Sequence, residues 1–255
     1  MRVKRRGNTT VLDHFRQSGS LKCLYPRVTG HTMQAVLVNT AGGVTGGDQF
    51  CTTVTTAPET DLTLTTQACE RAYRAQSGEV GEICTRLGVA PRATLNWLPQ
   101  ETLLFDGCAV SRQLTVDLAE GARFLMVEPM IFGRAAMGEN LTNCTFSDRI
   151  EIRRGGAPLY LDAMRLTGDV RAHLARPFIA NGAGAMASVV LVCNSAEAHL
   201  DPVRHLLPET AGASLLQPDV LVLRMLAEDS YALRQSLIPI LTRLSGGPLP
   251  RCWMI

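Results

Sequence analysis

Residues 54–64 read Val54-Thr55-Thr56-Ala57-Pro58-Glu59-Thr60-Asp61-Leu62-Thr63-Leu64, a strand pattern that enters a turn and continues as a second strand. Similar turns follow at Ala90-Pro91, Ala119-Glu120 and Ala157-Pro158, after intervals of 33, 29 and 38 residues. Because one such unit cannot cover its own apolar face, this self-similarity predicts stacked β rungs. The alternative is that these are ordinary turns between unrelated strands.

Alternating apolar and polar residues dominate the chain up to about residue 165. Leu114, Val116 and Leu118, for example, alternate with Thr115 and Asp117. This period of two is typical of strands that bury one face. The first two thirds of the chain are therefore predicted to be β structure.

The last third has a different pattern. Residues 183–193 and 220–225 are apolar runs typical of buried strands. Ser195 predicts the cap of a helix that ends near residue 205, and Asp229 or Ser230 the cap of a helix that ends near residue 244. The expected fold class is mainly β, with stacked β-sheets in a helical (β-solenoid-like) arrangement and about two α-helices in the C-terminal third.

Composition limits the classes of protein that fit. The chain has 255 residues, of which 46% are hydrophobic, so it can bury a sizeable core without disulfides. No linker-like stretch divides it, which predicts one domain over residues 1–255. Its 25 Lys and Arg nearly balance 23 Asp and Glu, which argues against nucleic-acid binding by bulk charge. The apolar run at 183–193 is too short to span a bilayer, so a cytoplasmic protein without membrane contact is expected.

Eight cysteines are scattered along the chain, with no pair in the spacing of a zinc site. They are predicted to be small, buried, apolar residues in a reducing compartment. A single reactive or metal-binding thiol among them stays open.

A glycine-rich segment runs from Gly42 to Asp48. A phosphate-binding loop would need Lys and then Ser or Thr after its last glycine, whereas this segment ends in Asp48, whose charge repels phosphate. The glycines therefore predict a tight crossing of backbones. Asp48 is kept as a candidate functional carboxylate.

Signatures of catalysis are missing from the sequence. Neither a GxSxG elbow nor an HExxH motif occurs. An alternative is a carbohydrate-active β-solenoid enzyme that uses paired carboxylates, although only 5% of residues are aromatic. Glu128 stands in the apolar run 124–130, which predicts either a strand end or a desolvated, paired carboxylate.

Five segments in order resemble the UreD (also called UreH) family of urease accessory proteins. They cover nearly the whole chain and comprise Asn39–Asp48, Thr65–Arg74, Trp97–Glu101, Gly133-Arg134 with Gly138-Glu139, and Leu249–Trp253.

The resemblance implies a non-catalytic, helically stacked β protein that binds apo-urease and the accessory proteins UreF and UreG. It also implies an internal passage for nickel in transit, with no tightly bound cofactor. The matching passage positions are Asp48, Glu70, Glu128 and Asp162; at Glu70 relatives often have a small or hydroxyl residue. Isolated carboxylates would attract Ni²⁺ and still release it, whereas a His/Cys cluster would trap it. A pure adaptor with no ion path is the other alternative.

The sequence also predicts surfaces that need partners. The apolar strand at 220–225 and the tail around Trp253 are expected to be exposed for this purpose.

Overall fold

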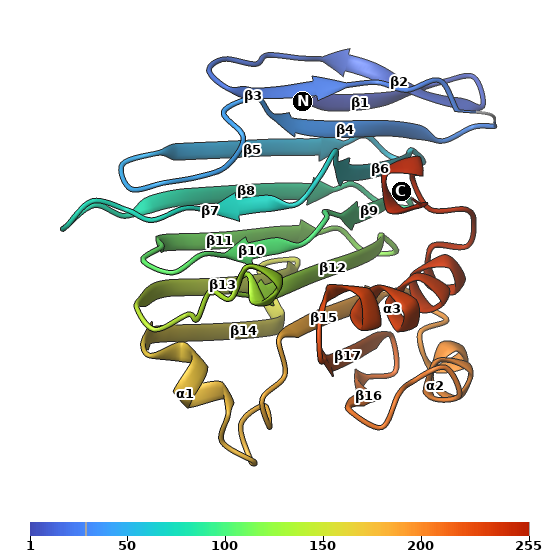
Figure 1. Cartoon of the computed structure of the whole chain (residues 1–255). Helices are drawn as coiled ribbons and strands as arrows, with labels where there is room; N and C mark the ends of the chain where they lie inside the picture. The colour runs from blue at the N-terminus through green and yellow to red at the C-terminus, as the bar shows by residue number, and fades with distance from the viewer. Residues whose placement is uncertain (29, 255) are drawn as a thin grey trace.

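The computed structural model describes residues 1–28 and 30–254. Its strands form two sheets, and within each sheet the strands follow one another along the same direction (Figure 1). In spatial order, the first sheet contains β14 (Ala157–Gly168), β13 (Cys144–Arg154), β11 (Ala109–Leu118), β8 (Gly81–Val89), β5 (Gln49–Thr56), β1 (Arg2–Arg6) and β2 (Thr9–His14). The second contains β16 (Ala211–Gln217), β17 (Val220–Ala227), β15 (Ala185–Val192), β12 (Arg123–Phe132), β9 (Thr94–Leu98), β6 (Asp61–Thr66), β4 (Met33–Asn39) and β3 (Leu21–Leu24), with β7 (Glu70–Ala72) and β10 (Thr102–Leu104) pairing beside β12.

The chain alternates between the two sheets from β4 to β13. Within the first sheet β5, β8, β11 and β13 are parallel neighbours, and within the second β4, β6, β9 and β12 are parallel neighbours. Each passage through both sheets is therefore one coil of a stack, which confirms the predicted β-solenoid-like fold. β14 and β15 then run antiparallel to β13 and β12.

Three of the four predicted turns carry the chain from the first sheet to the second. Each places a residue with positive φ two positions after its alanine: Glu59 (58°), Arg92 (57°) and Gly121 (69°). The left-handed conformation reverses the chain within a few residues. Glu59 and Arg92 also form an ion pair (2.9 Å), so successive turns stack on one another.

The fourth predicted rung turn was wrong. Ala157 and Pro158 lie inside β14, and the reversal occurs at Gly155 and Gly156, both with positive φ. Two such glycines favour a tight hairpin, so the chain returns antiparallel in the same sheet instead of crossing to the other.

Three α-helices occur in the described part of the chain: α1 (Val170–Leu174), α2 (Glu197–Arg204) and α3 (Ser230–Ser245), with 3-10 turns η1 (Ala135–Met137) and η2 (Arg251–Met254). The Asp229 cap of α3 is confirmed, since its carboxylate accepts from the Ala232 amide (2.8 Å). The Ser195 cap was wrong: α2 begins after Ala196, and the Ser195 hydroxyl lies beside the Cys193 sulfur. α1 was not predicted because five residues are too few to show a helical period.

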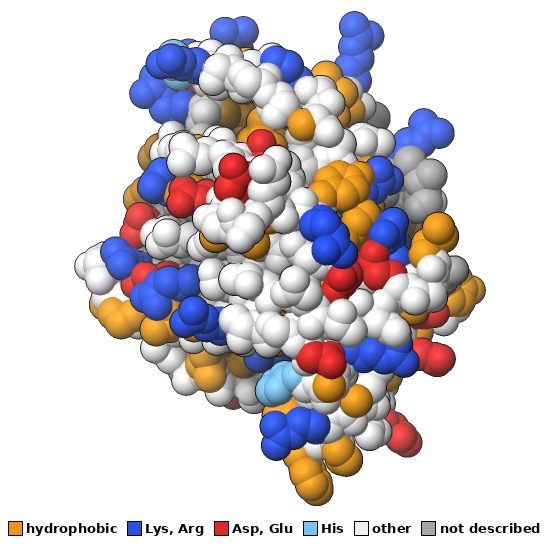
Figure 2. Space-filling model, turned by 60° about the vertical axis from the view of Figure 1, so that its left-hand side comes forward, with side chains coloured by type: hydrophobic (Ala, Val, Ile, Leu, Met, Phe, Trp, Pro, Cys, Tyr) orange, Lys and Arg blue, Asp and Glu red, His pale blue; other side chains and the backbone are white. Residues whose placement is uncertain are grey.

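The core between the sheets is apolar, and α3 covers the outer face of the second sheet with Leu233, Leu237, Ile240, Leu241 and Leu244. None of the described helices is long and apolar enough to cross a membrane. On the face shown in Figure 2, acidic and basic side chains are interspersed.

The predicted partner-seeking surfaces were wrong. Leu221, Leu223 and Met225 of β17 are buried beneath α3. Trp253 is fully buried, and its indole Nε1 donates a hydrogen bond to the carbonyl oxygen of Leu98 (3.0 Å). Both apolar segments find their partners within the chain.

The glycine-rich segment is a close crossing of backbones, as predicted. A Cβ atom on Gly43 would lie 2.3 Å from Cε2 of Tyr73 and 2.5 Å from the carbonyl oxygen of Arg71. That carbonyl is fixed because it accepts from the amide of Val44 (2.8 Å).

Gly43→Ala is therefore expected to lower the free energy of unfolding by about 3 kcal/mol, because a rigid backbone atom must move. Urea denaturation measures the change. Gly212→Ala is the matched control, since its added Cβ meets nothing within 4 Å. Equal midpoints for the two variants would contradict the assigned role of Gly43.

Candidate functional site

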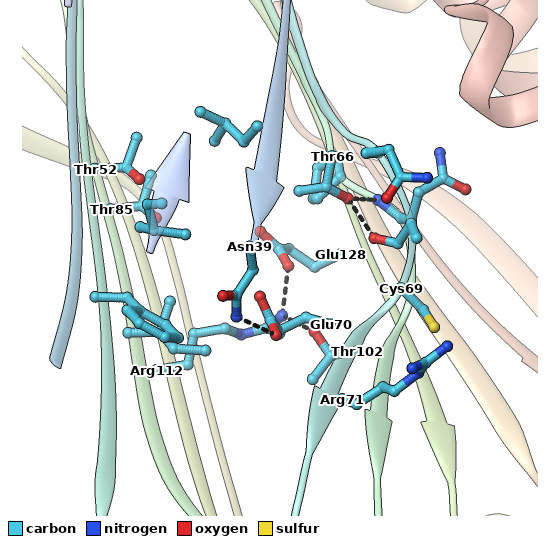
Figure 3. A pocket seen from close by; sticks show the side chains of 18 of the residues that line it. Asn39, Thr52, Thr66, Cys69, Glu70, Arg71, Thr85, Thr102, Arg112 and Glu128 are labelled. Atoms are coloured by element: carbon cyan, nitrogen blue, oxygen red, sulfur yellow. Dashed lines mark hydrogen bonds and ion pairs between the residues drawn. The ribbon is translucent and has the colours of Figure 1, made fainter. Parts of the chain in front are cut away.

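A cavity of about 210 Å³ lies between the two sheets. The first sheet contributes side chains from β5, β8 and β11 to its wall, and the second contributes side chains from β4, β6, β9 and β12 (Figure 3). The polar lining side chains that matter for its chemistry are Asn39, Glu70, Thr102, Arg112 and Glu128.

One part of the wall contains a buried triad formed by Arg112, Glu128 and Asp148. The Arg112 guanidinium contacts a Glu128 oxygen at 2.7 Å, and both Asp148 oxygens at 2.9 and 2.7 Å. Trp97 donates from its indole Nε1 to the other Glu128 oxygen (2.7 Å), and Thr102 accepts from Arg112 (3.0 Å). Every charged atom of Glu128 therefore has a partner.

Electrostatics at the triad follow from burial. Desolvation raises the pKa of Glu128, and the neighbouring Asp148 adds to this, while the Arg112 guanidinium and the Trp97 hydrogen bond oppose it. Two carboxylates and one guanidinium leave the triad with one net negative charge when all three are ionised. Of the two alternatives that the sequence left open for Glu128, the structure shows the desolvated, paired carboxylate inside β12 and not the strand end.

Sequence reasoning missed the other two members of the triad, Arg112 and Asp148. Arg112 and Asp148 lie on β11 and β13, at positions that face the interior in strands whose other inward residues are apolar. A charged residue at an inward position of an alternating strand was the available signal. Its partner could not be identified, because parallel stacking brings together residues distant in the sequence.

Glu70 has the more available carboxylate. One of its oxygens accepts from the Asn39 side chain (3.0 Å), as the dashed line in Figure 3 shows. Burial raises the pKa of Glu70, the Asn39 and Arg71 hydrogen bonds lower it, and the charge of Asp48 adds to the increase. No cation forms an ion pair with Glu70 among the described residues.

Asp48 lies next to this cavity. Its carboxylate accepts from the amide of Thr45 (2.9 Å) and lines a hollow of about 810 Å³. This hollow and the inter-sheet cavity share four lining residues: Leu21, Leu37, Phe50 and Thr52. The two spaces are therefore adjacent, with Asp48 and Glu70 acting electrostatically on each other.

Asp162 occupies a separate place. It lies on β14, forms an ion pair with Arg224 and accepts from the Tyr160 hydroxyl (3.1 Å). It lines neither of the two spaces. The structure thus brings Glu70 and Glu128 into one cavity, places Asp48 beside them, and leaves Asp162 apart.

The donor set of the cavity consists mainly of oxygen atoms. Over residues 1–28 and 30–254, no group of three or more His, Cys, Asp and Glu side chains is arranged to hold a metal ion. Carboxylate, amide and hydroxyl oxygens can attract a divalent cation without enclosing it.

Residues 1–254 match the sequence family described as the UreD urease accessory protein. The chain belongs to this family. Proteins named urease accessory protein UreD are 55% identical in Ruegeria pomeroyi (98% of this chain, 97% of the relative) and 52% identical in Roseobacter denitrificans (99% and 92%). One from Brucella suis is 44% identical (94% and 87%). The resemblance carried by the five segments is confirmed, and UreD membership supports a chaperone role in urease maturation.

Proposed function

We propose that this UreD protein is a non-catalytic cytoplasmic scaffold that binds apo-urease together with UreF and UreG, and that nickel passes through it as cargo. The inter-sheet cavity is the proposed passage. Glu70 is its principal cation-attracting group, with Asp48 at the adjoining hollow. Membership of the UreD family supports the role in maturation, and the geometry of the cavity supports the ion path.

The observation that best supports this proposal is the environment of the Glu70 carboxylate. It is half-buried, lines the cavity and has an amide partner, while no cation forms an ion pair with it among the described residues. A carboxylate in such surroundings attracts a divalent ion strongly, because low dielectric screening increases the Coulomb energy. One carboxylate with few neighbouring donors releases the ion again, which suits transit.

Glu128 has a different role in this proposal. Both of its oxygens are already engaged by Arg112 and Trp97. It therefore contributes negative potential to the wall and keeps the triad fixed. The same engagement makes Glu128 a poor candidate for the acid or base of a paired-carboxylate glycosidase, because both of its oxygens already accept hydrogen bonds.

Glu70→Gln, coexpressed with urease and its accessory proteins, is expected to lower urease activation by about tenfold at limiting nickel, the effect of losing about 1.4 kcal/mol of attraction. Urease activity and the nickel content of the purified enzyme are the measurements. Glu120→Gln is the matched control, because it makes the same chemical change in an exposed turn between the two sheets.

Copurification with the partners shows whether a loss of activation comes from a blocked ion path or from a complex that fails to assemble. The ion path requires that Glu70→Gln leaves the complex assembled while nickel loading falls. If the complex stays intact and nickel loading of urease is normal, the ion path is wrong and the protein is a pure adaptor. If the unaltered protein does not copurify with urease, UreF or UreG, the scaffold proposal itself is wrong.

A further inference from the structure

Two cysteines lie side by side on the outer face of the first sheet. Cys51 of β5 and Cys84 of β8 are register partners in the parallel ladder. Their sequence neighbours Thr52 and Thr85 line the inter-sheet cavity, so by strand alternation both thiols point to the opposite, outward face. The prediction of buried cysteines is wrong for this pair, because Cys51 is exposed and Cys84 is half-buried.

The spacing of the strands limits which chemistry suits this pair. Neighbouring strands are about 4.8 Å apart, which lies within the range of about 4.4–6.8 Å between the Cα atoms of a disulfide. Two metal–thiolate bonds of about 2.3 Å, laid end to end, span about 4.6 Å. An ion bridging the two sulfurs in a linear arrangement therefore also fits the ladder, and the reducing compartment expected for this chain keeps the two thiols free to bind it.

A cationic side chain is placed beside the pair. The Arg86 guanidinium donates from Nη1 to the Cys51 sulfur (3.4 Å). Burial raises the pKa of Cys84, which Arg86 opposes and the neighbouring Cys51 increases. Positive charge bound at the pair would therefore favour the thiolate form of Cys84.

The number of donors selects the ion. No third His, Cys, Asp or Glu joins Cys51 and Cys84 in a metal-binding arrangement within the described residues. Zn²⁺ in structural sites takes four ligands, and Ni²⁺ favours tetragonal nitrogen and oxygen sets, so neither is satisfied here. Soft thiolate ligands select Cu(I).

We infer that Cys51 and Cys84 form a two-coordinate site for Cu(I). Two thiols bind one Cu⁺ and release two protons, which gives a bis-thiolate unit with one negative charge. The Arg86 guanidinium hydrogen-bonds to that unit and compensates its charge. No electron transfer is involved, and the site is independent of the proposed nickel path.

A second cysteine pair provides a contrast within the same chain. The sulfurs of Cys108 and Cys144 are 3.5 Å apart, but both residues are buried in an apolar cluster. Burial among apolar side chains shields both thiols from solvent, whereas a metal site needs an entry path. Exposure and the neighbouring guanidinium distinguish the Cys51–Cys84 pair.

The test is an anaerobic titration of the reduced full-length protein with Cu(I) against a chromophoric Cu(I) chelator. Cys51→Ser and Cys84→Ser are compared with Cys69→Ser and Cys252→Ser, which alter half-buried cysteines outside the pair. The unaltered protein and the controls are expected to bind one equivalent of Cu(I). In Cys51→Ser and Cys84→Ser the affinity for this equivalent is expected to fall by at least about a hundredfold. X-ray absorption should show two sulfur neighbours.

Thermal unfolding of each apo variant establishes that the serine substitutions leave the fold intact. Equal Cu(I) binding by Cys51→Ser, Cys84→Ser and the unaltered protein would overturn the assignment. So would a bound copper with three or four ligands, because the pair supplies only two.

Discussion

Arg112→Met is expected to lower the free energy of unfolding by about 3–5 kcal/mol at pH 7, because two buried carboxylates lose the guanidinium that pairs with both. Arg112, Glu128 and Asp148 are each less than 10% exposed, so solvent cannot replace the lost interactions. Urea denaturation monitored by tryptophan fluorescence measures the effect.

A triple variant is the control for this prediction. Arg112→Met combined with Glu128→Gln and Asp148→Asn removes all three charges and keeps an acceptor for the Trp97 indole. Since neutralising a whole buried ion cluster is often close to neutral in stability, this variant should recover most of the loss. If it is as unstable as the single variant, packing and not charge accounts for the role of Arg112.

The loss in Arg112→Met should also depend on pH. Burial raises the pKa of Glu128 in the folded protein, and removing Arg112 raises it further, since the guanidinium lowers it. For an acid with a raised folded pKa, the folded state binds more protons than the unfolded state. The cost is therefore complete above the folded pKa and decreases as the pH falls through it. The stability gap between the variant and the unaltered protein should narrow from pH 7 to pH 5; a widening gap would contradict the assignment.

Trp253→Ala is expected to lower the free energy of unfolding by about 3–5 kcal/mol, the usual cost of removing a large buried aromatic side chain. The indole is fully buried and donates to the carbonyl of Leu98. The Arg234 guanidinium lies 5.1 Å from its ring centroid and donates to the Trp253 carbonyl oxygen (2.7 Å). Urea denaturation and limited proteolysis of the C-terminal segment measure the loss.

Met254→Ala is the matched control, because Met254 is the next residue and is 67% exposed. It should change stability by less than about 0.5 kcal/mol. Trp253→Phe should lie between the two, since it keeps most of the apolar contact but leaves the Leu98 carbonyl without its donor. Equal effects at Trp253 and Met254 would show that the terminal segment does not stabilise the stack.

Local signals in the sequence were sufficient to predict the stacked architecture. The turns at Ala57, Ala90 and Ala119 recur because each coil has to cross between the same two sheets. The turn near Ala157 has the same residue types, but Gly155 and Gly156 permit a tighter reversal before it. The similarity of the turn sequences was therefore not enough to predict whether the chain crosses to the other sheet or returns in the same one.

The candidate site was predicted only in part, for a different physical reason. Glu128 could be recognised as desolvated from its apolar neighbours, whereas its partner Arg112 comes from another coil. Similarly, Glu101 follows the break at Pro99, where the sequence favours an exposed carboxylate. It is buried instead, because Arg234 of α3 forms an ion pair with it (2.9 Å). Such pairs depend on the register of distant elements, which one sequence does not specify.

The contact between Trp253 and Leu98 joins residues 155 positions apart. Coils between β4 and β13 need only their sequence neighbours, so they can form while the rest of the chain is still being synthesised. Closing so large a loop, by contrast, is slow and requires residues 251–254 to be available. We therefore expect η2 to dock against the end of β9 only after the coils themselves have formed.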